Sequence, residues 1–215
     1  MLFQIFQDSI AVLRKPNIES FKAHGKNDLT WPIIYFAIGS VVSVVLQIIR
    51  IPMQQAYFEQ QQAQLRQLNG NSFFTNLSSS AQSPSIIILL GLFGFILNLV
   101  MWIVMPYVVG RVLGGKGSFG QVAYNNSLVN VPLGILDGLI SFGITTPLSC
   151  LFLILSLSLD GMRLYLTSVG TQAAMGLEER GDFWKLLVAI FLAVVIGIGI
   201  SLAVAAGLVA LGIGR

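Results

Sequence analysis

Five long apolar stretches, each about the length of a membrane-spanning helix, constrain the fold of this chain more than any other feature. A helix needs roughly 20 mostly apolar residues to cross a bilayer. The stretches cover about residues 31–51, 85–109, 127–144, 148–168 and 185–213. Only 10% of the 215 residues are charged, whereas soluble domains contain roughly a quarter. The sequence therefore predicts an all-α, polytopic integral membrane protein. It excludes an ordinary soluble enzyme, a disordered chain and a nucleic-acid binder with a basic face.

Lysine and arginine are distributed unevenly over the connections between these stretches. Nine of the 12 lie in the N-terminal segment, in the loops after the second and fourth stretches, or just before the latter loop. The other three are Arg50, Arg66 and Arg215. Because cytosolic connections are enriched in these residues, we predict five spans with the N-terminus in the cytosol and the C-terminus outside, in a plasma or inner membrane. Residues 54–84 are then the one long external polar loop, with a helix-forming first half and a linker-like second half.

Residues 1–30 form a cytosolic segment ahead of a membrane domain at 31–215. In this segment apolar residues recur at helical spacing and Pro16 follows as a stop signal, which predicts a short amphipathic helix; the apolar residues are Phe6, Ile10 and Leu13. That helix could lie on the membrane surface or pack on the underside of the bundle, and the sequence supports both placements equally. Residues 1–10 have no basic start and no continuous apolar core, so we expect no signal peptide.

The chain contains one cysteine, Cys150, and one histidine, His24. These residues cannot supply an internal disulfide, a Cys/His metal cluster or a Ser-His-Asp triad, so we expect no metal, no cofactor and no catalytic residues. Residues 115–122 (GKGSFGQV) do match the glycine-loop pattern of protein kinases. A kinase also needs flanking strands, a catalytic loop and a metal-binding aspartate, whereas an apolar stretch follows here. We interpret the pattern as a cytosolic turn.

Polar residues within the apolar stretches are the candidate functional residues. A charge at the centre of a span costs about 2.5–3.5 kcal/mol on insertion scales, so its presence calls for a reason. Asp160 and Arg163 are three residues apart on one helical face, and we favour a structural pair in which they neutralise each other. Asp137 has no partner in its own stretch and must face the bundle interior, a water-filled crevice or another subunit. Asn98 and Asn130 are expected to form interhelical hydrogen bonds.

The fifth stretch contains a stripe of small residues at steps of four, Gly199, Ala203 and Gly207. Small residues allow membrane helices to approach closely, so this stripe predicts a helix-packing face. We favour packing inside the bundle, with a homodimer face as the alternative.

Several short motifs occur in a fixed order along nearly the whole chain. They are 12–16 (VLRKP) with Phe21, 114–119 (GGKGSF) before the third stretch, Pro132 early in that stretch, and 161–163 (GMR) in the fourth. In this order and spacing they resemble the Yip family of Ypt/Rab-interacting proteins, in particular its prokaryotic members. The resemblance implies five membrane spans, a cytosolic N-terminus and no enzymatic activity. The DLYGP-type motif of eukaryotic members is absent, so Rab binding is not transferred to this chain.

Two functions remain open at this point. The first is a non-enzymatic scaffold or accessory subunit in membrane organisation, trafficking or assembly of a membrane complex. It would contact partners through the cytosolic loop of Lys116, Gly117, Ser118 and Phe119. The second is a small transporter or channel-like protein built on Asp137, with a water-accessible crevice. The scaffold instead predicts a closed bundle with Asp137 bonded to an asparagine. We expect partners in the lipid bilayer, other membrane proteins or a second copy, and no nucleic acid.

Overall fold

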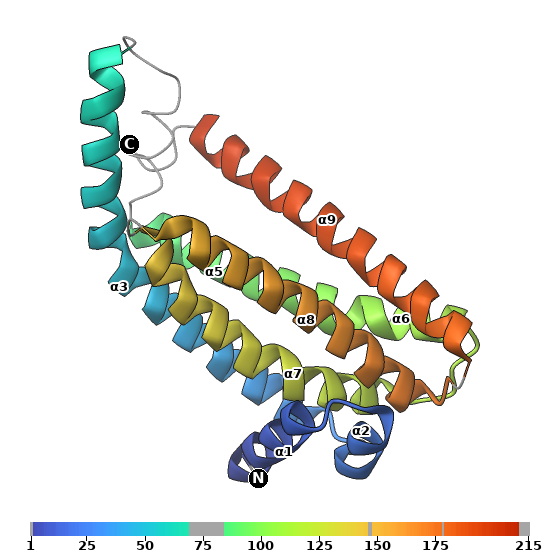
Figure 1. Ribbon diagram of the computed structural model, residues 1–215. Coiled ribbons are helices and arrows are strands. Elements are labelled where there is room, and N and C mark those ends of the chain that lie inside the picture. The colour runs from blue at the N-terminus through green and yellow to red at the C-terminus, as the bar shows by residue number, and fades with distance from the viewer. Residues whose placement is uncertain (1, 69–83, 146–147, 178, 211–215) are drawn as a thin grey trace.

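The computed structural model describes residues 2–68, 84–145, 148–177 and 179–210, and this part of the chain is helical without any strand (Figure 1). Its elements are α1 (Leu2–Arg14), α2 (Ile18–His24), α3 (Thr30–Leu68), α5 (Pro84–Leu99), the π-helix η1 (Val100–Val104), α6 (Met105–Val112), α7 (Phe119–Ile140), the 3₁₀-helix η2 (Ser141–Thr145), α8 (Ser149–Met175) and α9 (Arg180–Ala210). The predicted all-α class is confirmed.

Four helical segments of the described chain are long and apolar enough to cross a membrane: Thr30–Arg50, Leu92–Val112, Ser149–Met175 and Gly181–Val204. They overlap the first, second, fourth and fifth predicted stretches. No more than 22% of the most apolar window in each is buried within the chain. Most of this apolar surface therefore faces outward, which is favourable in lipid and unfavourable in water. The protein is a multi-pass membrane protein.

The helix α7, which contains most of the predicted stretch 127–144, is not among these four because its interior is polar. It packs against α3 and α8, with α1 across its first half, and every residue from Val122 to Val131 is buried. Three of those buried residues are Asn125, Asn126 and Asn130. α7 is thus an inner helix, and its neighbours separate its polar groups from the surroundings of the bundle. The fifth span and the orientation of the termini stay predictions.

The helix α3 continues well past its apolar part and bends there (Figure 1). Pro52 lies inside the helix; it has no N–H to donate and its ring collides with the carbonyl four residues earlier, which kinks a helix. Beyond the bend α3 runs to Leu68. This confirms the helix expected in the first half of the polar loop 54–84, whereas its second half lies almost entirely outside the described residues.

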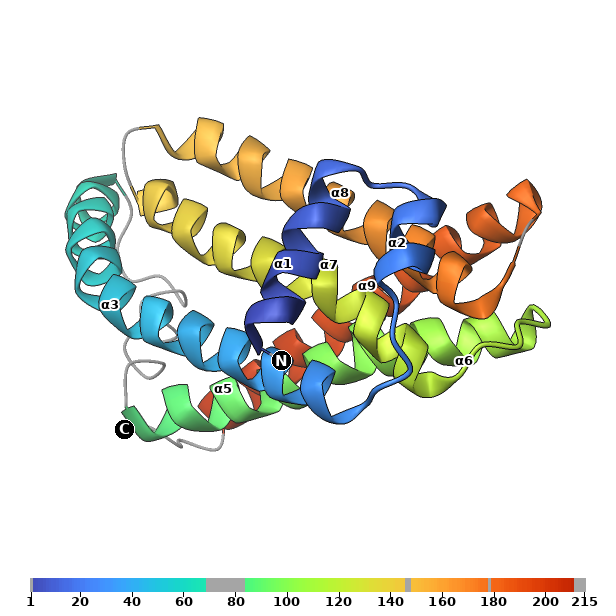
Figure 2. The same cartoon turned by 90° about the horizontal axis from the view of Figure 1, so that it is seen from below.

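The short helices α1 and α2 lie across one end of the bundle, where α1 contacts α7 and α2 contacts α8 (Figure 2). Ile5 and Val12 of α1 are buried against the bundle, while Phe3 and Phe6 on its other face are exposed. α1 is therefore amphipathic as predicted and packs on the underside of the bundle. Its second apolar face is exposed.

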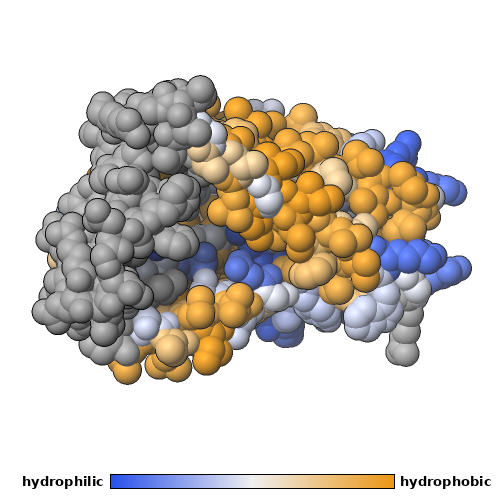
Figure 3. All heavy atoms as spheres, turned by 90° about the horizontal axis from the view of Figure 1, so that it is seen from above, coloured by the Kyte–Doolittle hydropathy of each residue, from blue (hydrophilic) through white to orange (hydrophobic). Residues whose placement is uncertain are grey.

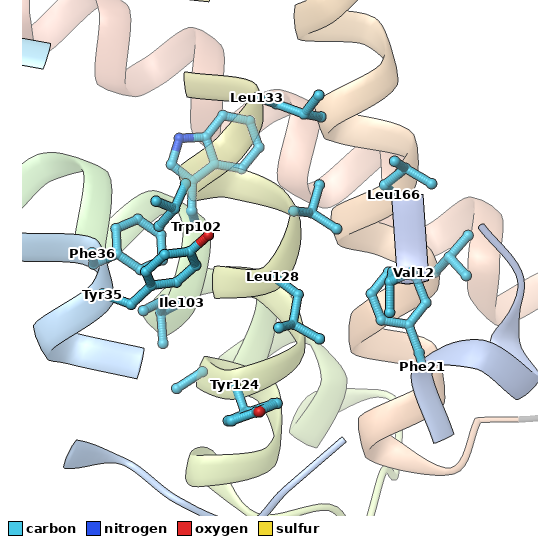
Figure 4. Packing of buried hydrophobic residues seen from close by; sticks show 14 of the residues in the cluster. Val12, Phe21, Tyr35, Phe36, Trp102, Ile103, Tyr124, Leu128, Leu133 and Leu166 are labelled. Atoms are coloured by element: carbon cyan, nitrogen blue, oxygen red, sulfur yellow. The ribbon is translucent and has the colours of Figure 1, made fainter. Parts of the chain in front are cut away.

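The hydrophobic core surrounds the first half of α7 (Figure 4). Phe36 of α3 and Trp102 of η1 lie on one side of this helix, and Phe21 of α2 and Leu166 of α8 lie on the other. Leu128 of α7 is completely buried between them. This packing holds the first half of α7 in place, and with it the polar side chains farther along the helix.

Candidate functional site

A polar cavity of about 410 Å³ lies between α3, α5, α7 and α8. Its polar and ionisable lining residues come from these helices and η2: Ser40, Ser43, Gln47, Arg50, Asn98, Asn130, Asp137, Ser141 and Arg163. The volume is in the range of about 300–1,000 Å³ that is usual for small-molecule sites. Seen from above, hydrophilic atoms lie in a hollow between hydrophobic surfaces (Figure 3). Four of the five predicted intramembrane polar residues thus line one cavity; the fifth, Asp160, does not.

Arg163 forms the inner wall of this cavity and is held by three neighbours. Its Nε donates to Asn130 Oδ1 at 2.5 Å, and its Nη2 donates to Asn98 Oδ1 at 3.4 Å. Its Cζ lies 4.3 Å from the centroid of the Trp102 ring. The amide groups of Asn98 and Asn130 are themselves oriented, because their Nδ2 atoms donate to Gly94 O at 2.8 Å and to Thr167 Oγ1 at 3.0 Å. Each asparagine therefore presents its oxygen to the guanidinium.

Asn126 links α7 to the helix that contains Trp102, at a point where a backbone hydrogen bond of that helix is missing. Pro106 has no N–H, so it cannot donate to the carbonyl of Trp102 four residues earlier. Asn126 Nδ2 donates to that carbonyl at 2.9 Å and also lies 3.1 Å from Thr171 Oγ1. The π-helix η1 ends at Val104, two residues before Pro106. Such π-helical turns often occur at functional positions. Near Pro106 the helix therefore has a wider, π-helical turn, and Asn126 of α7 donates to the carbonyl of Trp102 within it.

Asp137 lies farther along α7 from Asn130, by roughly 10 Å at 1.5 Å per residue. Its Oδ1 accepts a hydrogen bond from Ser156 Oγ at 2.6 Å. No hydrogen bond links it to Asn98 or Asn130, whose oxygens contact Arg163 instead. The structure therefore differs from the closed bundle expected for a scaffold, in which Asp137 would be hydrogen-bonded to an asparagine.

Asp160 and Arg163, expected to neutralise each other, make no direct ion pair, although their charges still interact. The described chain shows no nitrogen–oxygen contact of 4.0 Å or less between these two side chains, and Asp160 is exposed. The spacing along α8 is suitable, but Arg163 reaches across to α7, α5 and η1, where two amide oxygens and an aromatic face are available. Arg163 therefore contacts residues of other helices rather than Asp160 on its own helix.

The small-residue stripe on α9 faces away from the described bundle. Gly199, Ala203 and Gly207 are exposed, and a Cβ atom added at either glycine would meet no described atom within 4 Å. At Gly197 a Cβ atom would instead lie 2.1 Å from Met101 Sδ. α9 separates from the other helices toward its C-terminal end (Figure 1). The structure gives this stripe no packing partner within the described residues, and its role stays a prediction.

The loop proposed for partner contact is largely occupied by contacts within the chain. A Cβ atom at Gly117 would lie 2.0 Å from Ala174 O, so only glycine fits beside the end of α8. Ser118 caps α7 in a capping box with Gln121. Phe119 packs edge-on against Tyr107, with ring centroids 5.1 Å apart. Lys116 alone of the four loop residues is exposed, although its backbone N–H donates to Met175 O at 3.0 Å.

One polar cluster outside the cavity was not found by sequence reasoning. Asp8 of α1 accepts from Tyr124 Oη at 2.7 Å and from Lys26 Nζ at 2.9 Å. Burial raises the pKa of Tyr124, and the carboxylate of Asp8 raises it further. The tyrosine therefore stays protonated and donates over the whole neutral range. This cluster fastens α1 to α7; its members are far apart in the sequence and give no local signal.

The described residues contain no group of three or more His, Cys, Asp and Glu side chains that could hold a metal ion. A family model described as the Yip1 domain matches residues 10–211, which is nearly the whole chain. Comparisons with curated proteins and with solved structures found no match.

Proposed function

Because the chain belongs to the Yip1 domain family of non-enzymatic membrane proteins, we propose that it is a scaffold or accessory subunit of a membrane complex. It acts by helix–helix contact in a plasma or inner membrane, as a five-span protein with a cytosolic N-terminus. Its partners are other membrane proteins, with a second copy of the chain as the alternative.

The observation that carries this proposal is the open outer half of α9. Membrane helices associate through close packing of small residues, because lipid supplies no hydrophobic drive between them. Gly199 and Gly207 have free space around them in the described chain, and the C-terminal part of their helix lies apart from the other helices (Figure 1). A partner helix could approach this face without displacing any described side chain.

The test is crosslinking and affinity purification from native membranes, comparing the wild type with Gly199→Leu and Gly207→Leu. Both variants place a bulky side chain where a partner would pack, and we expect at least a tenfold drop in partner recovery at equal expression. Gly161→Leu on α8 is the matched control, because a Cβ atom there also meets no described atom within 4 Å. Equal recovery from all variants would exclude this face as the contact.

A second candidate function, a small transporter or channel, is favoured by the polar cavity that reaches Asp137. Solute flux into vesicles containing the purified chain, with Asp137→Asn beside the wild type, tests it. Loss of flux at normal expression and stability supports transport through the cavity. Loss of stability alone assigns Asp137 a structural role. Ser156→Ala is the companion variant, since it frees the carboxylate and keeps its charge.

A further inference from the structure

Arg163 brings a positive charge to membrane depth without a carboxylate beside it. Its three neighbours are two neutral amides and an indole ring, and no acidic oxygen lies within 4.0 Å in the described chain. The amide oxygens and the aromatic face contribute only partial negative charge. A charged group removed from water is costly unless it is paired as well as hydrogen-bonded. The guanidinium is therefore held in place without a direct ion pair, and the carboxylates of Asp160 and Asp137 act on it only from farther away.

The guanidinium also has hydrogen-bond donors left over. Arginine has five N–H donors, and two nitrogens are used, Nε toward Asn130 and Nη2 toward Asn98. Nη1 makes no hydrogen bond within the described residues, and Nη2 keeps a second N–H. These two nitrogens form one end of the planar fork, the edge that matches two oxygens of an oxyanion.

The space beside this group is kept open by a glycine. A Cβ atom at Gly134 of α7 would lie 3.9 Å from Arg163 Nη2, so any larger side chain at this position would extend into the cavity. The same cavity is lined by hydroxyl and amide groups of α3 that can donate to an anion: Ser40, Ser43 and Gln47. The site thus combines a guanidinium, free volume and neutral donors.

The charges of the cavity favour an anion. The residues that line it include two cationic side chains, Arg50 and Arg163, and one anionic side chain, Asp137; Asp160 acts on Arg163 from outside the lining. Asp137 is turned toward Ser156 of α8 by a hydrogen bond of 2.6 Å. Its carboxylate is therefore directed to a neighbour other than Arg163.

We propose that this cavity is a binding site for a phosphate-type oxyanion, which the guanidinium edge of Arg163 holds through two parallel hydrogen bonds. The group can belong to a free phosphate solute or to the head group of an anionic lipid; the chemistry of recognition is the same. The inference does not depend on the scaffold role. It assigns a ligand class to the cavity whether or not anything is transported through it.

The experiment uses the full chain purified into nanodiscs of phosphatidylcholine. One arm measures equilibrium binding of radiolabelled orthophosphate. The other adds phosphatidic acid to the discs and measures retained lipid by native mass spectrometry. Saturable orthophosphate binding supports a site for a soluble anion. Retention of phosphatidic acid without orthophosphate binding supports a site for a lipid head group. Absence of saturable binding in both arms overturns the proposal.

Variants locate the binding. Arg163→Gln removes the charge, and Gly134→Leu fills the space while keeping Arg163; we expect each to weaken binding at least tenfold. Gly134→Ala is the folding control for the second variant, because a Cβ atom there makes only an ordinary contact. Arg14→Gln removes an exposed charge far from the cavity and should leave binding unchanged. If Arg163→Gln does not fold, Gly134→Leu alone decides, and binding as tight as in the wild type contradicts the site.

Discussion

The guanidinium carbon of Arg163 lies 4.3 Å from the centre of the Trp102 ring, so a cation of α8 rests against an aromatic face of η1. The π-helical turn that contains Trp102 and the hydrogen bond from Asn126 to its carbonyl together fix where this ring lies. The position of the charged group thus depends on a backbone irregularity in another helix.

This contact predicts energetic coupling between the two residues. Trp102→Leu and Arg163→Gln together should destabilise the protein less than the sum of the single changes, with a coupling of about 0.5–2 kcal/mol, the range for cation–π pairs. Unfolding in detergent by added SDS measures all four proteins. Trp184→Leu is the control for removal of an indole, because Trp184 is 62% exposed. Additive effects at Trp102 and Arg163 would contradict the coupling.

Asn126→Ala should destabilise the fold by about 1–3 kcal/mol, because it leaves the buried carbonyl of Trp102 without the donor that replaces the missing N–H of Pro106. Pro106→Ala restores a backbone N–H at that position. In the Pro106→Ala background the Asn126→Ala change should therefore cost clearly less. The four proteins of this cycle are compared by the same unfolding assay, and an equal cost in both backgrounds would exclude this explanation of the bond.

Gly117→Ala should destabilise the protein by about 1–3 kcal/mol, the usual cost of overpacking. The added methyl group would collide with the backbone carbonyl of Ala174, which cannot rotate away as a side chain could. The thermal midpoint in detergent measures the loss. Gly161→Ala is the control, since it lies in a helix with open space around it. That change should stabilise slightly, because alanine is a better helix former than glycine.

The Asp8 cluster predicts that Tyr124→Phe or Asp8→Asn loosens α1 without unfolding the bundle. Hydrogen–deuterium exchange over residues 2–14 should become faster in both variants. Asp182→Asn, which removes a surface ion pair with Lys185, should leave that exchange unchanged. A global rise in exchange over α7 and α8 would instead show that the cluster supports the whole core.

The same cluster has a pH dependence with a defined sign. The folded protein raises the pKa of Tyr124 above the ordinary value near 10. The protonated tyrosine then contributes stability that is complete below pH 10 and is lost as the pH rises toward the elevated folded pKa. Exchange of α1 should therefore be constant near neutral pH and accelerate above about pH 10. In Tyr124→Phe this acceleration should be absent.

The helices were predictable from sequence because each long apolar run must satisfy its own backbone in lipid. The start of α7 at Phe119 was missed, although its signal was present: Ser118 and Gln121 have the spacing of a capping box. Hydropathy alone placed the beginning of that stretch too late, because Gln121, Asn125 and Asn126 lower the hydropathy of the first half of α7.

The partner of Arg163 could not be predicted in the same way. The spacing to Asp160 along α8 is a local property, whereas the contacts with Asn98 and Asn130 depend on how three helices are placed together. The kink near Pro106 was predictable from proline chemistry, but its donor, Asn126, comes from another helix. Sequence reasoning identified Asn98, Asn130, Asp137 and Arg163 among the residues that line the cavity. It missed the other polar lining residues and the contacts of Arg163 with the two asparagines.

The buried asparagines of α7 have a consequence for synthesis of the chain. Asn125 donates to Gly170, and Asn126 and Asn130 donate to Thr171 and Thr167, so all three find partners on α8, which the ribosome makes later. Until α8 emerges, the hydrogen bonds to Gly170, Thr171 and Thr167 cannot form, and α7 is a polar segment that partitions poorly into lipid. If α7 is the fifth span, we expect it to enter the bilayer together with α8 rather than before it. The two helices would then be synthesised one after the other but inserted as a pair.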